Sequence, residues 1–178
     1  MMRTDSRRNI VLIGMPGVGK STVGVLLAKR LGFSFLDTDI YIQTHEGKSL
    51  QELIQEHGTA GFCDIEARLM VTISATAHVI ATGGSVVYRK EAMSHFRKNG
   101  IVVHLDIDLQ RLVKRLDDID ARGVVIAPGQ TIEALFAERH FLYRKYADIS
   151  LPTDGLTPEQ VVKKAVDVLK YANADYPT

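Results

Sequence analysis

The fold is decided by the stretch Asn9-Ile10-Val11-Leu12-Ile13-Gly14-Met15-Pro16-Gly17-Val18-Gly19-Lys20-Ser21. Its second half is an unbroken G-x-x-x-x-G-K-[ST] motif between a short β-branched run and a segment with helical spacing of apolar residues. The glycines let successive backbone N–H groups turn around an anion, and the following helix N-terminus favours negative charge. A simple glycine turn into a helix would not require Lys-Ser at its end. The motif therefore predicts a nucleoside triphosphate site.

The motif also assigns contacts within this predicted site. We expect Lys20 to reach the β- and γ-phosphates of ATP and the Ser21 hydroxyl to bind Mg²⁺. The other nucleotide-binding candidates in this segment are Gly14, Pro16, Gly17, Val18, Gly19 and Thr22. These residues identify a nucleotide site but leave the reaction open.

Strand-sized and helix-sized segments alternate along the rest of the chain. Short apolar, β-branched runs predict strands at residues 9–14, 34–36, 78–81, 101–105 and 148–151. Helical spacing of apolar residues predicts helices at residues 20–31, 50–57, 61–76, 109–116, 132–146 and 158–171. This alternation is typical of βαβ units, in which a mostly parallel sheet is covered by helices on both faces. We therefore expect a single α/β domain over residues 1–178.

Composition narrows the class of protein. The chain has 178 residues, of which 46% are hydrophobic and 24% charged, enough for one domain with a substantial core. A formal net charge of +1 argues against a dedicated nucleic-acid binder, and no apolar run is long enough to span a bilayer. The single cysteine, Cys63, excludes an intrachain disulfide and fits a reducing compartment. We therefore expect a cytoplasmic monomer that acts on a small molecule, with no nucleic-acid or membrane partner.

Two carboxylates end the second predicted strand, in the sequence Asp37-Thr38-Asp39. They could cap the segment that follows, since Asp and Thr are favoured at helix N-termini. They could also serve chemistry, because ligands collect at the carboxyl ends of parallel strands. In that interpretation Asp37 holds Mg²⁺ through water. Asp39 accepts a hydrogen bond from a substrate hydroxyl, orients it and takes its proton.

Nearly end to end, the chain resembles the shikimate kinase family of P-loop kinases. The resemblance rests on the P-loop, Asp37-Thr38-Asp39, Ser49-Leu50 to His57-Gly58, Phe62 and Glu66, Thr82-Gly83-Gly84-Ser85, Arg115, Arg122, Arg139 and Thr153 to Pro158. It implies a three-layer P-loop NTPase-type fold with a five-stranded parallel sheet of order 2-3-1-4-5. It also implies a substrate-binding helical region at about residues 40–76 and a lid at about residues 117–130.

The resemblance implies ATP-dependent phosphorylation of a hydroxyl on a small metabolite, in the shikimate case the 3-hydroxyl. Lys20, Asp39 and the lid arginine Arg122 are the implied catalytic residues. Arg115 and the loop that ends at Pro158 match the adenine site, and Arg139 matches the arginine that binds the substrate carboxylate. The implied acceptor site contains Asp39, Cys63, Gly83, Gly84, Ser85 and Arg139.

Each of these arginines also has a structural interpretation that needs no ligand. Arg115 lies in a segment with other basic residues and could belong to a solvated face. Arg122 follows a run of aspartates with which it could form weak surface ion pairs. Arg139 could pack its aliphatic stem on a helix. Their joint match to the family favours function for all three.

The chain departs from the family pattern at four places. Cys63 stands where the family has a second arginine for the substrate carboxylate, Thr59 replaces a glutamate, and Ser85 replaces the third glycine of its loop. The lid lacks the proline that usually follows its arginine. Losing a hydrogen bond to a charged group costs roughly 1.5–3 kcal/mol, and a thiol cannot restore it.

The loss at Cys63 leaves the acceptor open. Arg139 could suffice alone, or Arg68 or Arg89 could supply a second guanidinium. The acceptor could instead be homoserine, with acidic groups for its ammonium, or a sugar acid. A nucleotide-binding module that has lost its acceptor is the alternative outside the enzymes. The six histidines show no metal-ligand spacing, and we assign them no chemistry.

Overall fold

The computed structural model describes residues 8–117 and 129–172. Its strands are β1 (Asn9–Ile13), β2 (Ser34–Asp37), β3 (His78–Ala81), β4 (Gly100–Asp106) and β5 (Ile149–Pro152). Its helices are α1 (Lys20–Leu31), α2 (Thr38–Glu46), α3 (Leu50–Met70), α4 (Lys90–Asn99), α5 (Leu109–Asp117), α6 (Ile132–Tyr146) and α7 (Pro158–Ala172), with a short 3₁₀ turn, η1 (Val86–Tyr88).

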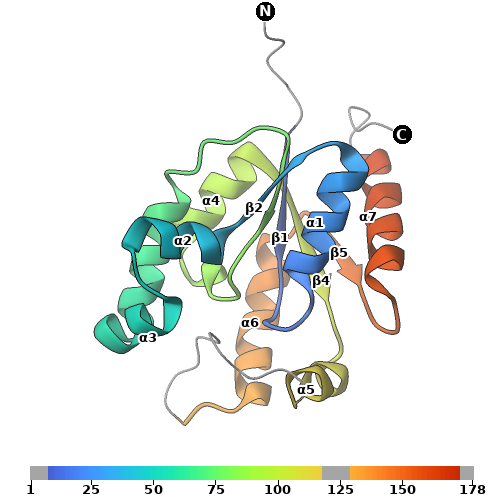
Figure 1. Cartoon of the computed structure of the whole chain (residues 1–178). Helices are drawn as coiled ribbons and strands as arrows, with labels where there is room; N and C mark the ends of the chain where they lie inside the picture. The colour runs from blue at the N-terminus through green and yellow to red at the C-terminus, as the bar shows by residue number, and fades with distance from the viewer. Residues whose placement is uncertain (1–7, 118–128, 173–178) are drawn as a thin grey trace, which may run out of the picture.

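The five strands form one parallel sheet in the order β2-β3-β1-β4-β5. Within the core, β1 is fully buried, and Leu12 pairs with Ala81 on one side and Val103 on the other. On one side of the sheet α1 packs against β2, β3 and α7, while α4 and α6 pack against β4 (Figure 1). The α/β class and the strand order expected from the sequence are confirmed.

A buried asparagine fixes the start of the central strand. Asn9 Nδ2 donates to the carbonyls of Ala75, at 2.7 Å, and Asn99, at 3.2 Å, while its Oδ1 accepts from the backbone N–H of His78 at 3.0 Å. These bonds join the segments that lead into β3 and β4 to the first residue of β1. The register of the three inner strands is therefore set at the end of the sheet opposite the P-loop.

The helix boundaries differ from the sequence prediction in three places. The helix expected to run to residue 76 ends at Met70, because the β-branched Val71, Thr72 and Ile73 disfavour helix and the Thr72 hydroxyl donates to the Leu69 carbonyl at 2.7 Å. The expected break between residues 57 and 61 is a kink at Gly58, where φ is 67°. Helices α2 and α4 were not predicted from apolar spacing.

All five strands point their carboxyl ends toward one edge, because the sheet is parallel. The P-loop follows β1, Asp37 ends β2, and the glycine loop at residues 82–85 follows β3. The motifs singled out in the sequence therefore meet at this edge. In the described part of the chain, no helix combines the length and apolar character required to cross a membrane.

Candidate active site

Lys20 lies folded back over the P-loop at the first position of α1. Its Nζ donates to the carbonyls of Gly14 at 2.8 Å and Met15 at 2.9 Å. Burial lowers the pKa of Lys20 to about 8, while the charge of Asp39 opposes that shift. The Lys20 ammonium is therefore close to Asp39, just after β2. Because it is buried, it interacts strongly with an anion.

Ser21 and Asp37 are joined across the site. Ser21 Oγ donates to Asp37 Oδ2 at 2.7 Å, and Asp37 Oδ1 accepts from the backbone N–H of Asp39 at 2.9 Å. One carboxylate therefore caps α2 and faces the P-loop hydroxyl, so the two interpretations of Asp37 are compatible. A hydroxyl beside a carboxylate is the hard oxygen pair that Mg²⁺ prefers.

Asp39 faces the glycine loop after β3. The backbone N–H of Gly83 donates to the Thr38 hydroxyl at 3.1 Å, which fixes the loop beside α2. A Cβ at Gly83 would lie 3.1 Å from Asp39 Oδ1 and 2.7 Å from Glu66 Oε1, so only glycine fits between these carboxylates. Burial raises the pKa of Asp39, the charge of Asp37 adds to the rise, and Lys20 opposes it. A carboxylate of raised pKa is a stronger base.

The second glycine of this loop lies between two other parts of the site. A Cβ at Gly84 would lie 3.0 Å from Arg139 Nη1 and 3.0 Å from Pro16 Cδ. The Gly84 carbonyl accepts from the Tyr143 hydroxyl at 2.8 Å. The loop is thus held between the P-loop and α6, and the missing side chain is what allows Arg139 to reach it.

Arg139 is buried, with 1% of its surface exposed, although the sequence allowed a merely packed stem. Its Nε donates to the Tyr88 hydroxyl at 3.0 Å, and its guanidinium lies 5.0 Å from the centre of the Tyr88 ring. Its charge also lowers the pKa of Glu66 against the effect of burial. Arg139 is therefore a buried cation that is held in place by Tyr88, the last residue of η1.

Cys63 is 4% exposed and lies in α3, close to Arg139 and Glu66. Burial raises the pKa of its thiol to about 11, so the thiol is neutral at physiological pH. It opens onto a cavity of about 230 Å³ lined by Thr59, Ala60, Cys63, Tyr88, Arg89, Gln130 and Glu138. Thr59 and Cys63, two positions where the sequence was expected to depart from the family pattern, therefore line one cavity.

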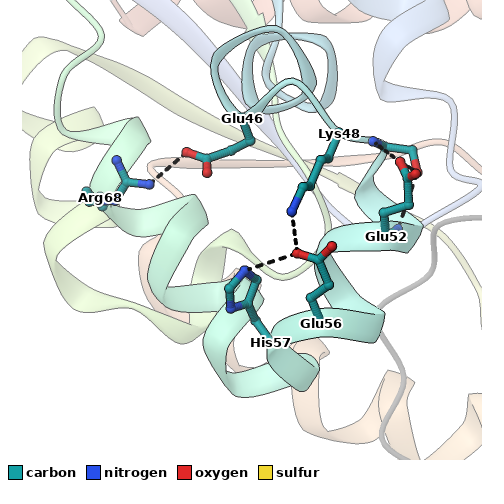
Figure 2. A network of polar contacts seen from close by, with 7 residues as sticks. Glu46, Lys48, Glu52, Glu56, His57 and Arg68 are labelled. Atoms are coloured by element: carbon teal, nitrogen blue, oxygen red, sulfur yellow. Dashed lines mark hydrogen bonds and ion pairs between the residues drawn. The ribbon is translucent and has the colours of Figure 1, made fainter.

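The two arginines considered as substitutes for the missing guanidinium have different surroundings. Arg68 donates to Glu46 Oε1 at 2.7 Å and is exposed, and Figure 2 shows this pair linking α3 to α2 beside the Lys48–Glu56 pair. Arg89 instead lines the cavity with Cys63, and its Nε donates to Asp64 Oδ1 at 2.8 Å. Arg89 is thus the one of the two that faces the space beside Cys63.

The nucleotide side of the site is completed by α5. Arg115 Nη1 donates to the Val18 carbonyl at 3.0 Å, so this arginine lies on the P-loop rather than only on a solvated face. A Cβ at Gly17 would lie 3.0 Å from Leu116 Cδ2, which shows how closely α5 packs there. Pro158 is exposed at the start of α7. Arg122 and most of the expected lid lie outside the described residues.

Two contacts in the site were not anticipated from the sequence. Tyr88 supports Arg139 and Tyr143 holds the Gly84 carbonyl, although neither belongs to a motif considered above. Tyr143 follows Arg139 by four residues on α6, so both side chains lie on one helix face. That spacing is the signal from which Tyr143 could have been found.

Comparisons with known proteins agree with this geometry. Residues 16–170 match the family model described as "Shikimate kinase". A shikimate kinase of Thermodesulfovibrio yellowstonii is 40% identical over 162 residues, which cover 89% of this chain and 93% of that protein. The chain belongs to the shikimate kinase family.

Two solved shikimate kinase structures are similar in fold to this chain over most of its length. The shikimate kinase from Acinetobacter baumannii in complex with shikimate has a TM-score of 0.86 and 28% identity, covering 95% of this chain and 96% of that one. The shikimate kinase from Aquifex aeolicus has a TM-score of 0.79 and 34% identity, covering 92% and 97%. The family expected from the P-loop, the acidic pair and the glycine loop is therefore confirmed.

Proposed function

We propose that this protein is an ATP-dependent kinase that transfers the terminal phosphoryl group of ATP to the 3-hydroxyl of shikimate. The observation that carries the proposal is the meeting of Lys20, Asp39 and Arg139 around the glycine loop at residues 83–84 in a chain of this family. This arrangement offers a phosphate-binding cation, a base and a carboxylate-binding cation in one place.

The residues suit phosphoryl transfer, because such a reaction has a loose transition state and depends mostly on positioning and charge neutralisation. Lys20 would leave the Gly14 and Met15 carbonyls and bind the phosphates. Asp39 would orient the acceptor hydroxyl and take its proton. Arg122, which lies outside the described residues, would balance charge on the transferred group, and Arg115 would border the adenine.

Mg²⁺ fits the oxygen pair formed by Ser21 and Asp37, which would hold it directly or through water. When bound there, the ion neutralises charge on the phosphates. To bind the ion, Asp37 Oδ2 only has to release its hydrogen bond from the Ser21 hydroxyl. Its second oxygen remains engaged at the start of α2.

At the acceptor end, Arg139 and Arg89 would share the shikimate carboxylate. Arg139 is positioned by Tyr88, the residue next to Arg89, and both residues 88 and 89 line the cavity beside Cys63. Arg89 would then provide the second cation that Cys63 cannot. Arg68 is less suitable, because it holds α3 to α2 through Glu46.

Homoserine is the second candidate acceptor, and one observation favours it. The carboxylate of Glu138 lines the same cavity, where its Oε2 accepts from Gln130 at 2.8 Å. An acid in the same cavity as Arg89 could bind the ammonium of an amino alcohol, whereas the shikimate ring offers no cation. The charge of the acceptor therefore distinguishes the two candidates.

The test is ADP release by the full chain with ATP, Mg²⁺ and one acceptor at a time: shikimate, homoserine or gluconate. Stimulation by shikimate that is lost in Lys20→Met and Asp39→Asn supports the proposal. Stimulation by homoserine or gluconate in place of shikimate overturns the assigned acceptor. ATP binding with no stimulation by any of them would leave a non-catalytic nucleotide-binding module.

A further inference from the structure

Three side chains capable of binding a metal converge outside the active-site residues discussed above. His104 and Asp106 end β4, and His140 lies on α6. His140 Nδ1 is 3.6 Å and His104 Nε2 is 4.0 Å from Asp106 Oδ1, and all three ligand atoms lie within 4.8 Å of one another. Both separations are longer than a hydrogen bond, so neither histidine bonds to Asp106 although the three ligand atoms lie close together.

His104 is the buried member of this cluster. Its side chain is 2% exposed and stacks on the Tyr143 ring at 5.1 Å, and its Nε2 is the ring nitrogen that faces Asp106.

The other two side chains leave the cluster accessible. Asp106 is 31% and His140 30% exposed, and the His140 ring stacks on Phe136 at 5.2 Å. An ion could therefore enter from solvent and keep water in its remaining coordination positions. The positive charges of Lys20 and Arg144 also act on His104, and Asp106 is the carboxylate that opposes them.

We propose that His104, Asp106 and His140 form a binding site for a divalent transition-metal ion of the zinc class. Two imidazoles and a carboxylate are the mixed nitrogen and oxygen set that Zn²⁺ and Co²⁺ accept, whereas Mg²⁺ prefers oxygen alone. Tetrahedral Zn²⁺ with bonds of about 2.0–2.1 Å holds its ligands about 3.3 Å apart. The present separations require small side-chain movements to reach that value.

Such a site would connect two parts of the kinase. It fastens the end of β4 to α6, and His140 directly follows Arg139. On the other side, a Cβ at Gly14 would lie 3.6 Å from His104 Cδ2 and 2.7 Å from the Leu105 carbonyl, so β4 touches the start of the P-loop. Bound metal therefore stabilises the folded chain at the junction between the nucleotide and acceptor halves.

The proposal is tested on the untagged full chain after treatment with a chelator. Titration with ZnCl₂ by calorimetry should give one ion per chain and raise the melting temperature. His140→Ala and Asp106→Asn should each weaken Zn²⁺ binding at least about tenfold and abolish that rise. His57→Ala removes an exposed histidine elsewhere and should bind as the wild type does.

Spectroscopy separates this site from binding at the thiol. Titration with CoCl₂ should produce visible bands of low coordination number without sulfur-to-metal charge transfer, in the wild type and in Cys63→Ser alike. The proposal is overturned if neither ion binds to the wild type, if both cluster variants bind as tightly as the wild type, or if the signal disappears in Cys63→Ser. Circular dichroism verifies that each variant is folded.

Discussion

The Ser85 hydroxyl lies 2.8 Å from Glu66 Oε2, and both side chains are buried. This hydrogen bond joins the glycine loop after β3 to the middle of α3. Burial raises the pKa of Glu66 to about 7, and the bond from Ser85 acts in the opposite direction by stabilising the ionised carboxylate. Ser85 therefore gives Glu66 a hydrogen-bond partner in the interior of the site.

Ser85→Ala should therefore destabilise the protein above neutral pH. The Glu66 carboxylate would lose a hydrogen bond in a buried place, at a cost of about 1–3 kcal/mol in the free energy of unfolding. Urea unfolding at pH 8 measures this change in the free energy of unfolding. Ser94→Ala, an exposed serine on α4, is the matched control and should change little. Equal effects in the two variants would show that the buried bond contributes nothing of its own.

Glu66→Gln should change how stability depends on pH. The folded-state pKa of about 7 lies above the ordinary 4.5, so the folded protein binds the Glu66 proton more tightly than the unfolded chain does. That contribution to stability is complete below pH 4.5 and is lost as the pH rises through 7. Glutamine cannot ionise, so its advantage over glutamate should grow between pH 5 and pH 8 to on the order of 3 kcal/mol.

The measurement is urea unfolding of both proteins at several pH values in that range. Glu91→Gln, at an exposed position in the first turn of α4, serves as the control and should run parallel to the wild type. A difference between Glu66→Gln and the wild type that stays constant from pH 5 to pH 8 would contradict the assignment of the titration to Glu66.

Asp39→Asn should remove turnover while leaving ATP binding largely intact. General-base catalysis typically contributes about 10²–10⁴ in rate, and an amide cannot accept the proton. Because burial and Asp37 raise the pKa of Asp39, the wild-type kcat/KM should fall with decreasing pH in a range above that of an ordinary aspartate. Steady-state kinetics against pH and binding of a fluorescent ATP analogue measure the two effects. A variant with normal kcat would exclude Asp39 as the base.

Gly84→Ala should impair both halves of the site. Its Cβ would lie 3.0 Å from Arg139 Nη1 and from Pro16 Cδ, so either the arginine or the P-loop must move. Overpacking of this kind costs about 1–3 kcal/mol. We expect KM to rise for the acceptor and ATP together, measured by varying each substrate at saturation of the other. An unchanged KM for the acceptor would mean that Arg139 tolerates the methyl group.

Local patterns explain which parts of this architecture could be predicted. The P-loop and Asp37 are short motifs whose chemistry depends on neighbours in sequence, and their positions agree with the prediction. Helix α4 was missed because its buried face contains little beyond Ala92, Met93 and Phe96, too short a stripe to stand out by spacing. The bond from Ser85 to Glu66 joins residues 19 apart, and no pattern in a single chain indicates that they meet.

Arg89 and Cys63 permit the sharpest test of the acceptor site. If Arg89 provides the second cation for the shikimate carboxylate, Arg89→Met should raise the KM for shikimate by about 10- to 100-fold and leave the KM for ATP unchanged. Arg68→Met removes an exposed arginine that pairs with Glu46, and it should leave both constants unchanged. Arg89→Met also removes the hydrogen bond from Arg89 to Asp64 Oδ1. Asp64→Asn is therefore the control that separates the loss of this structural bond from the loss of a contact with shikimate.

Cys63→Arg completes a double-mutant cycle with Arg89→Met. Cys63 and Arg89 border one cavity, so a guanidinium introduced at position 63 should rescue the Arg89→Met variant if both arginines serve the same carboxylate. In the wild-type background the added arginine should improve shikimate binding less, because one partner is already present. Additive effects of the two substitutions would show that Arg89 acts elsewhere. A gain with homoserine instead would assign the cavity to a different acceptor, with Glu138 as the group that binds its ammonium.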